Sequence, residues 1–297
     1  MTAMTRVQTY SAPADFAVAA GPLLAADRAR STVISTVLAG LIARPYPLPP
    51  VLAVAFDDDR PVAAALQTPP HPLTVLATPG SGMPGTWTGL AAAVHAVGAA
   101  PQIIGGPAED ARAFGAAWTR LTGARIEPHD ALLLYRLGPF IPPHGVPGKA
   151  RRADVEDPAD LLLLAQWFHD FAVFTRVVPP SPGPDPTAVR TRAARGAVAV
   201  LWVDDDRPVA MAAHSVVVGG MARIGPVFTP EALRGRHYGS AVTAAAVESA
   251  QAAGATEIVL FTDADYPTSN AVYRRLGFAR IGRFANLSAT HAPVPGG

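Results

Sequence analysis

The sequence predicts a mixed α+β protein made of two tandem units, each a mostly antiparallel mixed sheet flanked by helices. The string DDDRPVA begins at Asp57 and again at Asp204, which places the two copies about half the chain apart. A second pair of similar strings, RLTGARI (120–126) and RLGFARI (275–281), follows in the same order. Both halves also begin with hairpin patterns and continue with a strand–helix–strand crossover. Repeats in the same order indicate a tandem duplication.

The elements of the first half follow from its apolar periodicity and its turn residues. A helical pattern comes first, and the DDDRPVA string then lies between two apolar runs of β type, which predicts a hairpin with an acidic turn. The expected helices lie near 21–43, 86–98 and 107–122, and the expected strands near 51–56, 61–67, 73–77, 101–105 and 130–136.

The segment GPFIPPHGVPGK (138–149) is rich in proline and glycine, which is typical of a linker. The predicted domains are therefore 1–138 and 151–297, joined by a linker at 139–150. In the second half a proline-rich break at 179–186 interrupts the helical pattern. The expected helices lie near 157–174, 187–195, 239–253 and 268–276, and the expected strands near 197–203, 208–218, 221–228, 256–262 and 278–287.

Composition excludes several classes of site and partner. The chain has no cysteine, so disulfides, thiolate metal sites and a cysteine nucleophile are excluded, and we expect no metal site. A net charge of +1 with 16% charged residues argues against a broad basic surface for nucleic acid. No uninterrupted apolar stretch approaches the ~20 residues that a membrane span needs, and the N-terminus lacks a signal-peptide pattern. We therefore expect a soluble cytoplasmic protein.

A basic, glycine-containing loop lies between the strand predicted at 221–228 and the helix predicted from Gly239. Backbone N–H groups at the start of a helix point the same way and favour an anion there. Gly235 and Gly239 let the backbone approach a ligand closely, and Arg234 and Arg236 add permanent positive charge. This combination suits a pyrophosphate. Taken alone, the loop is equally consistent with an ordinary solvated turn.

The loop and a downstream segment together resemble a known family. Arg234 and Gly239 stand at the first and last positions of a loop similar to the Q/R-x-x-G-x-G/A signature of the GCN5-related N-acetyltransferase (GNAT) family. The segment TSNAVYRRLGF (268–278) resembles that family's later motif of Asn, a helical Tyr and Gly-Phe. The resemblance covers about residues 150 to 287. The whole layout resembles bacterial tandem acetyltransferase-like proteins with a degenerate N-terminal half.

The resemblance implies acetyl-CoA as cofactor and assigns a role to each matching residue. The amides from Gly235 to Ser240, which include Arg236, His237, Tyr238 and Gly239, would hold the pyrophosphate. The backbone of Val227, Phe228 and Thr229 would pair with the pantetheine amides, and Asn270 would contact the cofactor arm. One departure is His237, which stands where the motif usually has Gly and so weakens the case for an unusual backbone angle.

The same resemblance places Tyr273 near the thioester sulfur, where its hydroxyl would protonate the leaving thiolate. A tyrosine pKa of about 10 is close to that of a thiol, which suits this role. The alternative is a core tyrosine. The general base is poorly marked, and water could relay the proton instead. Side chains considered as the base or as facing the acceptor are Asp263, Asp265, His214, Glu231, His169 and Asp170.

The first half lacks the features of the second. Residues 61 to 111 contain no Lys or Arg, and the loop PGSGMPG (79–85) is neutral. Alignment of the RLTGARI and RLGFARI strings places Gly115 opposite Asn270 and Trp118 opposite Tyr273. We therefore expect this half to keep the fold without a cofactor site, to bury one face of the second half and to shape the acceptor cleft.

The leading functional hypothesis is an acetyl-CoA-dependent N-acetyltransferase that acts on a small-molecule amine by direct transfer in a ternary complex. One alternative is acetylation of a protein or peptide N-terminus. Another is a non-catalytic CoA-binding regulatory module, which would not need Tyr273. The acceptor and the oligomeric state cannot be read from the sequence.

Overall fold

The computed structural model describes residues 5–44, 46–80, 84–176 and 182–290, which form two compact units. The first unit holds the described residues up to Leu133 together with those from Gly282 on, and the second runs from Leu134 to Ile281. These limits depart from the predicted domains 1–138 and 151–297, because the C-terminal strand belongs to the first unit. No helix in the described part of the chain is long and apolar enough to cross a membrane.

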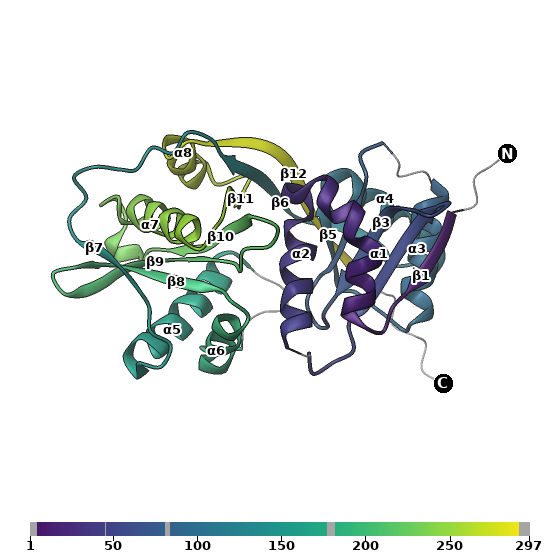
Figure 1. Cartoon of the computed structure of the whole chain (residues 1–297), viewed down its shortest axis with the longest axis horizontal. Coiled ribbons are helices and arrows are strands. Elements are labelled where there is room, and N and C mark those ends of the chain that lie inside the picture. Colours follow the sequence, from purple (N-terminus) through teal and green to yellow (C-terminus); the bar gives the residue numbers. More distant parts are fainter. Residues whose placement is uncertain (1–4, 45, 81–83, 177–181, 291–297) are drawn as a thin grey trace. The chain divides into compact units, whose positions relative to one another are not determined.

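The first unit follows the order of elements that its sequence predicts, with one additional strand and a divided first helix (Figure 1). Its strand order begins β1-β2-β3-β4-β5, with β12 beside β5. Its elements are β1 (Thr5–Thr9), α1 (Pro13–Ala26), α2 (Arg28–Ala43), β2 (Val51–Asp57), β3 (Arg60–Gln67), β4 (Leu73–Ala77), α3 (Pro84–Ala96), β5 (Ile103–Pro107), α4 (Ala108–Thr122) and the larger parts of β6 (Arg125–Leu137) and β12 (Phe278–Thr290).

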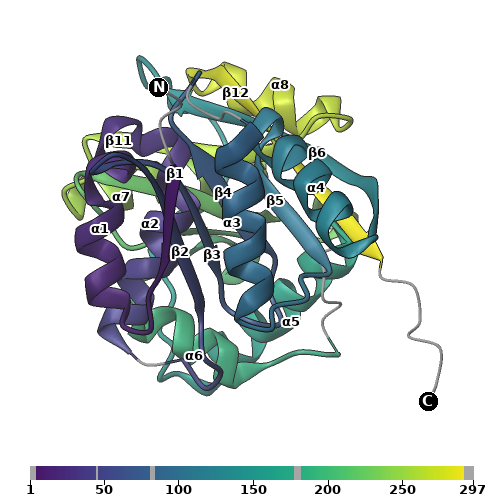
Figure 2. The same ribbon diagram turned by 90° about the vertical axis from the view of Figure 1, so that its right-hand side faces the viewer.

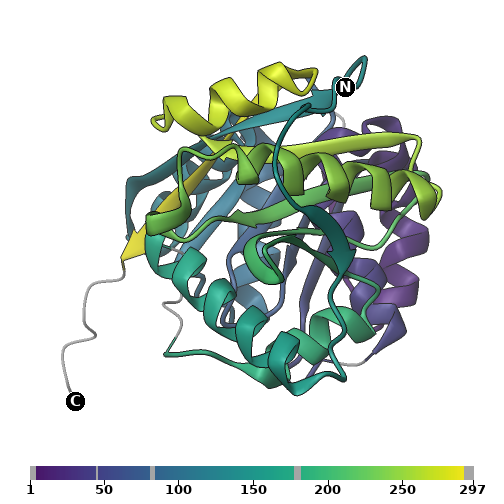
Figure 3. The ribbon, with the colours of Figure 1, turned by 90° about the vertical axis from the view of Figure 1, so that its left-hand side faces the viewer.

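The second unit repeats this order element by element (Figure 3). Its strands run β6-β11-β10-β9-β8-β7. Its elements are β7 (Lys149–Arg152), α5 (Pro158–Phe174), α6 (Pro186–Ala194), β8 (Val198–Asp204), β9 (Arg207–His214), β10 (Met221–Phe228), the 3₁₀ turn η1 (Glu231–Leu233), α7 (Tyr238–Ala252), β11 (Glu257–Asp263) and α8 (Pro267–Arg275).

The two DDDRPVA copies occupy matching hairpin turns, which confirms the duplication. Asp57 pairs with Arg60 at the end of the β2–β3 hairpin, and Asp204 pairs with Arg207 at the end of the β8–β9 hairpin. Both ladders shift register at the same place, two residues before the turn's first Asp. Asp58 and its counterpart Asp205 both take a left-handed φ, at 52° and 47°. Asp tolerates this conformation better than most side chains, which explains the acidic turn.

Each unit buries its sheet between two layers of helices. In the first unit, α1 and α2 pack on one face of β2, β3 and β4, and α3 and α4 pack on the other (Figure 2). In the second unit, α7 packs on β8, β9 and β10, and the opposite face is covered by α5 and α6 through the cluster of Leu164, Val189 and Met211. Burial of apolar side chains on both faces explains the near-continuous apolar runs of the central strands.

Most of the last strand of the second half belongs to the first unit, and the end of the last strand of the first half belongs to the second unit. In the first unit β12 pairs antiparallel with β5, from Phe284 opposite Pro107 to Ser288 opposite Ile103. In the second unit the end of β6 lies beside β11. A Cβ at Gly105 would lie 2.4 Å from the Asn286 side-chain oxygen, so a larger residue there would force the Asn286 side chain of β12 to move. The sequence analysis assigned each final strand to its own half, because periodicity shows that a strand exists but not which strand it pairs with.

Several predicted elements change in the structure. The helix expected at 21–43 is two helices, α1 and α2, separated at Asp27, whose carboxylate caps α2 by accepting from the Arg30 amide. The short edge strands β1 and β7 are additional, and β7 takes up the end of the predicted linker. Arg151 of β7 forms an ion pair with the buried Asp160 of α5, and this hydrogen bond is the main cause of the lowered pKa of Asp160. The proline-rich break at 179–186 begins in residues outside the described part of the chain.

Candidate functional site

The strands β10 and β11 part halfway along β10. Their parallel ladder runs only from Met221 opposite Glu257 to Ile224 opposite Leu260. Beyond Ile224, β10 shifts register and continues along β9, with Phe228 opposite Met211. The backbone of β10 from Val227 on therefore has no ladder partner in β11. Free backbone N–H and C=O groups on such an edge can pair with an extended ligand as another strand would.

The sequence encodes this parting in a dipeptide that the sequence analysis passed over. Gly225 takes a φ of 139°, which glycine adopts far more readily than other residues, and Pro226 has no N–H to donate to a ladder. Glycine and proline inside a strand pattern typically mark a bulge. The Gly225–Pro226 pair was therefore a usable signal, although the predicted strand 221–228 ran straight through it.

The basic loop forms a concave run of backbone amides at the start of α7. Gly235 and His237 both take left-handed φ angles, at 79° and 63°. Within the described residues, no backbone group accepts from the five amides between Gly235 and Gly239. Consecutive free amides in this conformation at a helix N-terminus make an anion site. The amide of Ser240 differs, because it already donates to the His237 carbonyl at 3.0 Å.

The departure from glycine at His237 does not change the backbone angle. The sequence analysis took the missing glycine as a weakness, and this expectation was wrong, because His237 adopts a φ of 63° as the N-cap of α7. Histidine is one of the residue types enriched in the left-handed region. Its side chain is exposed, so it leaves its own N–H available within the loop.

The side chains around the loop brace it from two sides. Arg234 donates from Nε to the Thr229 carbonyl at 3.2 Å and stacks over the Phe174 ring at 4.9 Å. The buried Tyr238 side chain donates its hydroxyl to Asp204, which is also the main cause of the raised pKa of Tyr238. The second DDDRPVA turn thus also anchors the first residue of α7.

Asn270 lies in the first turn of α8 with one side-chain atom unsatisfied. Its Nδ2 donates to the carbonyls of Asp263 and Tyr266, both at 3.0 Å. Its Oδ1 is buried and has no hydrogen-bond partner in the described part of the chain. A buried acceptor without a donor costs free energy unless a ligand supplies the missing N–H. The predicted contact of Asn270 with a cofactor arm fits this geometry.

Tyr273 lies one turn further along α8 and is half buried. Its ring packs edge-on against Phe278 at 6.2 Å between centroids. No group in the described residues hydrogen-bonds to its hydroxyl, so that hydroxyl is available to a ligand. Burial raises the pKa of Tyr273 to about 12 rather than the expected 10. The side chain therefore remains protonated at neutral pH, although it is a weaker acid than the sequence analysis assumed.

The parted strands, the amide loop and the α8 residues coincide with a family match. Residues 164–278 match the model of the acetyltransferase (GNAT) family. The second half of this chain carries a GNAT domain. Family members generally use acetyl-CoA and acetylate amines.

Solved structures share this fold over nearly the whole chain. A tandem GNAT protein from the clavulanic acid biosynthesis pathway is 17% identical, with a TM-score of 0.59 over 98% of this chain and 99% of that one. A GCN5-related N-acetyltransferase from Sphaerobacter thermophilus is 20% identical, with a TM-score of 0.59 over 98% and 97% of the two chains. At these identities the likeness shows the fold alone, which is that of tandem GNAT units.

Among curated proteins, a mycothiol acetyltransferase from Arthrobacter sp. (strain FB24) is 44% identical over 66 residues. The matched segment is 21% of this chain and 20% of that protein. The similarity therefore concerns one segment of each protein and says nothing about the substrate of this chain.

None of the candidate bases is positioned as a clear acceptor for the proton of the amine. His214 is buried, and because its Nδ1 lies 2.9 Å from the Ser215 carbonyl it must be the donor there. Its Nε2 lies 3.1 Å from Ser249 Oγ, and burial is the main cause of its lowered pKa. Neutral and hydrogen-bonded on both nitrogens, His214 is a core residue.

The carboxylates have local structural roles or none that the structure defines. Asp263 Oδ1 accepts from the Asp265 amide at 2.8 Å and so braces the turn before α8. Asp170 accepts from Gln166 at 2.7 Å along α5, next to His169. Glu231 is exposed in η1. Transfer of the amine proton through water to the solvent needs no dedicated base.

In the first unit a carboxylate takes the place that the cofactor arm would need. Ala64 and Met211 each directly follow a copy of the DDDRPVA string. Ala64 pairs with Leu76, and Met211 pairs with Phe228. Ala77, the residue after Leu76, is therefore the counterpart of Thr229. The Ala77 amide donates to the buried Asp110 at 3.0 Å, and Arg30 donates to the same Asp110 oxygen at 3.0 Å. The amide at this end of β4 is thus already satisfied from within the chain.

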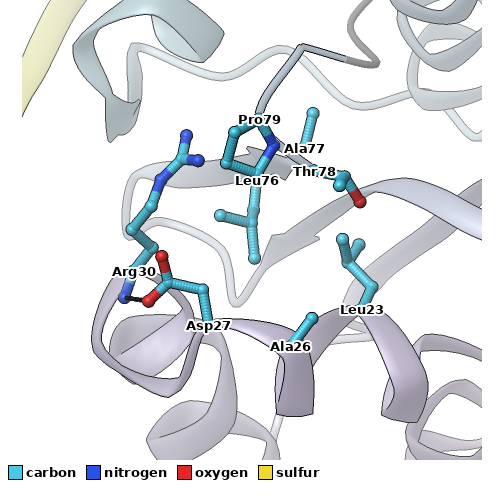
Figure 4. Close-up of a pocket in the computed structure, with 8 residues that line it drawn as sticks. All are labelled: Leu23, Ala26, Asp27, Arg30, Leu76, Ala77, Thr78 and Pro79. Atoms are coloured by element: carbon cyan, nitrogen blue, oxygen red, sulfur yellow. Dashed lines mark hydrogen bonds between the residues drawn. The ribbon is translucent and has the colours of Figure 1, made fainter.

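A cavity of about 220 Å³ remains at this end of β4 (Figure 4). It is lined by the strand's end and by the α1–α2 junction, through Leu23, Ala26, Asp27, Arg30, Leu76, Ala77, Thr78 and Pro79.

The counterparts of Asn270 and Tyr273 in the first unit are core residues. Trp118 is fully buried and stacks on Phe114, and a Cβ at Gly115 would lie 3.3 Å from both Ile126 and Leu287. Part of the neutral loop 79–85 lies outside the described residues.

The buried Asp110 predicts a specific pH dependence. Desolvation raises its pKa to about 6, so the folded state binds the proton more tightly than the unfolded state does. Proton binding to Asp110 therefore contributes fully to the free energy of unfolding below about pH 4, and this contribution is lost as the pH rises through 6. Asp110→Asn keeps an acceptor for the Ala77 amide and removes the titration. Relative to this variant, we expect the wild type to lose about 2–3 kcal/mol between pH 4 and 7 in urea unfolding. A pH-independent difference would contradict the assignment.

Proposed function

We propose that the second unit is an acetyl-CoA-dependent N-acetyltransferase that transfers an acetyl group directly to the amine of a small molecule. The observation that carries this proposal is the arrangement of unsatisfied groups in one GNAT domain. The free edge of β10, the free amides before α7 and the buried Asn270 Oδ1 all lack partners in the described residues. An elongated ligand with amide groups and a pyrophosphate would satisfy all three.

The residues divide the binding of acetyl-CoA between them. The amides from Gly235 to Gly239 would hold the pyrophosphate, with Arg234 and Arg236 adding charge. The backbone of Val227, Phe228 and Thr229 would pair with the pantetheine amides. Asn270 Oδ1 would accept one N–H of the same arm. When bound, acetyl-CoA supplies the activated acetyl thioester.

Tyr273 would donate the proton that the leaving sulfur takes up. The amine nitrogen forms a bond to the acetyl carbon, the carbon–sulfur bond breaks, and the sulfur leaves as the thiol. The nitrogen loses one proton, and the Tyr273 hydroxyl gives one to the leaving sulfur and is later reprotonated from solvent. Its raised pKa keeps this hydroxyl protonated at neutral pH, as a donor requires. The nitrogen's proton would leave through water.

Two measurements test the proposal. Calorimetry with CoA and with acetyl-CoA tests binding, and a panel of amines with acetyl-CoA, followed by thiol release and product mass, tests turnover. We expect saturable binding of both cofactors and release of free thiol with at least one amine, matched by an acetylated product. Binding without any transfer would favour a regulatory module, and failure to bind CoA would overturn the proposal.

A further inference from the structure

Arg192 and Arg223 lie close together in the second unit, and within the described residues neither has a carboxylate partner. Arg192 and Arg195 lie at the end of α6, and Arg223 lies on β10. Arg223 Nη1 is buried and has no hydrogen-bond partner within the described residues. Neither Arg192 nor Arg223 forms an ion pair with any described Asp or Glu. Arg192 is solvent accessible and lies over the Phe168 ring at 5.3 Å.

This cluster is costly for the folded protein. Burial is the main cause that lowers the pKa of Arg223, to about 10, and the charge of Arg192 lowers it further. The pKa of Arg192 is lowered by desolvation and by the charge of Arg195. A guanidinium such as that of Arg223, with a buried atom that lacks a partner and a like charge beside it, disfavours folding. A bound anion would remove this cost, which is why such clusters are typical of binding sites.

The position of Arg223 connects the cluster to the proposed reaction. Arg223 directly precedes Ile224, the last residue of β10 that pairs with β11. Ile224 lies opposite His214, which bonds to Ser249 of α7, so this pair faces α7. Side chains alternate along a strand, and Arg223 therefore faces the α5–α6 side. The cofactor arm is proposed to follow β10 from Thr229 back towards Gly225, so Arg223 lies just beyond the reacting end of that arm.

We propose that Arg223 and Arg192 bind an anionic group, a carboxylate or a phosphate, carried by the amine acceptor. The guanidinium fork donates two parallel hydrogen bonds to either group, which is the geometry that arginine serves best. The acceptor is thus an amine that carries a negative charge. This inference rests on the proposed function for the identity of the reaction, but the anion site itself can be tested without turnover.

The kinetic test uses matched amines with acetyl-CoA. β-Alanine and propylamine differ by a carboxylate, and phosphoethanolamine and ethanolamine differ by a phosphate. We expect kcat/KM to be at least about tenfold higher for an anionic member of one pair, and the pair that shows the larger preference identifies the group. Arg223→Gln and Arg192→Gln should each remove this preference through KM. Arg190→Gln, an exposed residue of the same helix on another face, serves as the control and should keep it.

A binding test separates failure of this inference from failure of the proposed function. Inorganic phosphate or β-alanine is titrated into CoA-saturated protein while the Arg223 guanidinium resonance is followed. If CoA does not bind, the proposed function fails, but a saturable shift of this resonance would still support the anion site. If CoA binds and neither anion shifts the resonance, or if both members of each pair react equally well, the inference is overturned.

Stability supplies a further readout that distinguishes binding from a structural role. Arg223→Met replaces an unpaired buried charge with an apolar side chain of similar length. We expect the melting temperature to rise by about 2–4 °C, while the preference for the anionic amine disappears. A lower melting temperature with unchanged kinetics would show that Arg223 serves the fold and would overturn the proposal.

Discussion

Replacement of Tyr273 with Phe is expected to lower kcat by about a hundredfold or more while CoA affinity stays nearly unchanged. Phe keeps the edge-on packing against Phe278, and it removes only a hydroxyl that has no partner in the described residues. A lost general acid typically costs this much in rate. Stability should therefore change little, because no intramolecular hydrogen bond is lost. Steady-state rates, a CoA titration and a melting curve on the same sample provide the measurement.

The pH profile adds a check on the same residue. Because burial raises the pKa of Tyr273 to about 12, the protonated acid should persist through neutral and mildly alkaline pH. In the free enzyme, loss of its proton should not reduce kcat/KM below about pH 10. A fully active Phe variant would remove Tyr273 from the mechanism and leave it as a packing residue.

Replacement of Gly239 with Val is expected to weaken CoA binding by about a hundredfold and to leave the fold intact. A Cβ at Gly239 would meet only Thr229 Oγ1, at 3.4 Å, and the backbone there is not left-handed, so the protein itself has room. The added methyl groups would instead occupy the space beside the free amides. Loss of one or two charge-assisted hydrogen bonds to a phosphate, at about 1.5–3 kcal/mol each, produces such an effect.

The matched control for this change is Gly21→Val, since Gly21 lies in α1 of the first unit with no atom within 4 Å of an added Cβ. Both variants should melt close to the wild type, and only Gly239→Val should lose CoA affinity by calorimetry. Equal affinity in the two variants would refute the assignment of the pyrophosphate to this loop.

The tandem fold could be predicted because its signals are local. The DDDRPVA copies mark turns whose acidic residues take the left-handed angle, and the two hairpins share even the position of their bulge. The loop before α7 could be found because its amides, glycines and arginines are consecutive in the chain. Asn270 and Tyr273 could be proposed as site residues because they belong to a motif within one short helix.

Other features could not be predicted from the sequence because they depend on contacts between residues that are distant in the chain. Whether β12 completes its own half or the other depends on its pairing with β5, and periodicity carries no such information. The Ala77 amide is satisfied by Asp110, which lies on a later helix. The sequence could therefore show that residues 61–111 contain no Lys or Arg, but not that the Asp110 carboxylate binds this amide. The raised pKa of Tyr273 reflects its surroundings rather than its neighbours in the chain.

By itself the sequence determined that the chain is a duplicated α+β protein whose second half carries the basic loop before α7 and the α8 motif. Patterns repeated along the chain and groups adjacent in it are enough for this, since turns, helix starts and glycine positions act over a few residues. Only the tertiary structure decided where β10 and β11 part and which amide and side-chain groups remain unsatisfied. It also decided that Arg192 and Arg223 lie together with no counter-charge among the described residues. Hydrogen-bond satisfaction and desolvation depend on every residue that packs around a group, and those residues come from all along the chain.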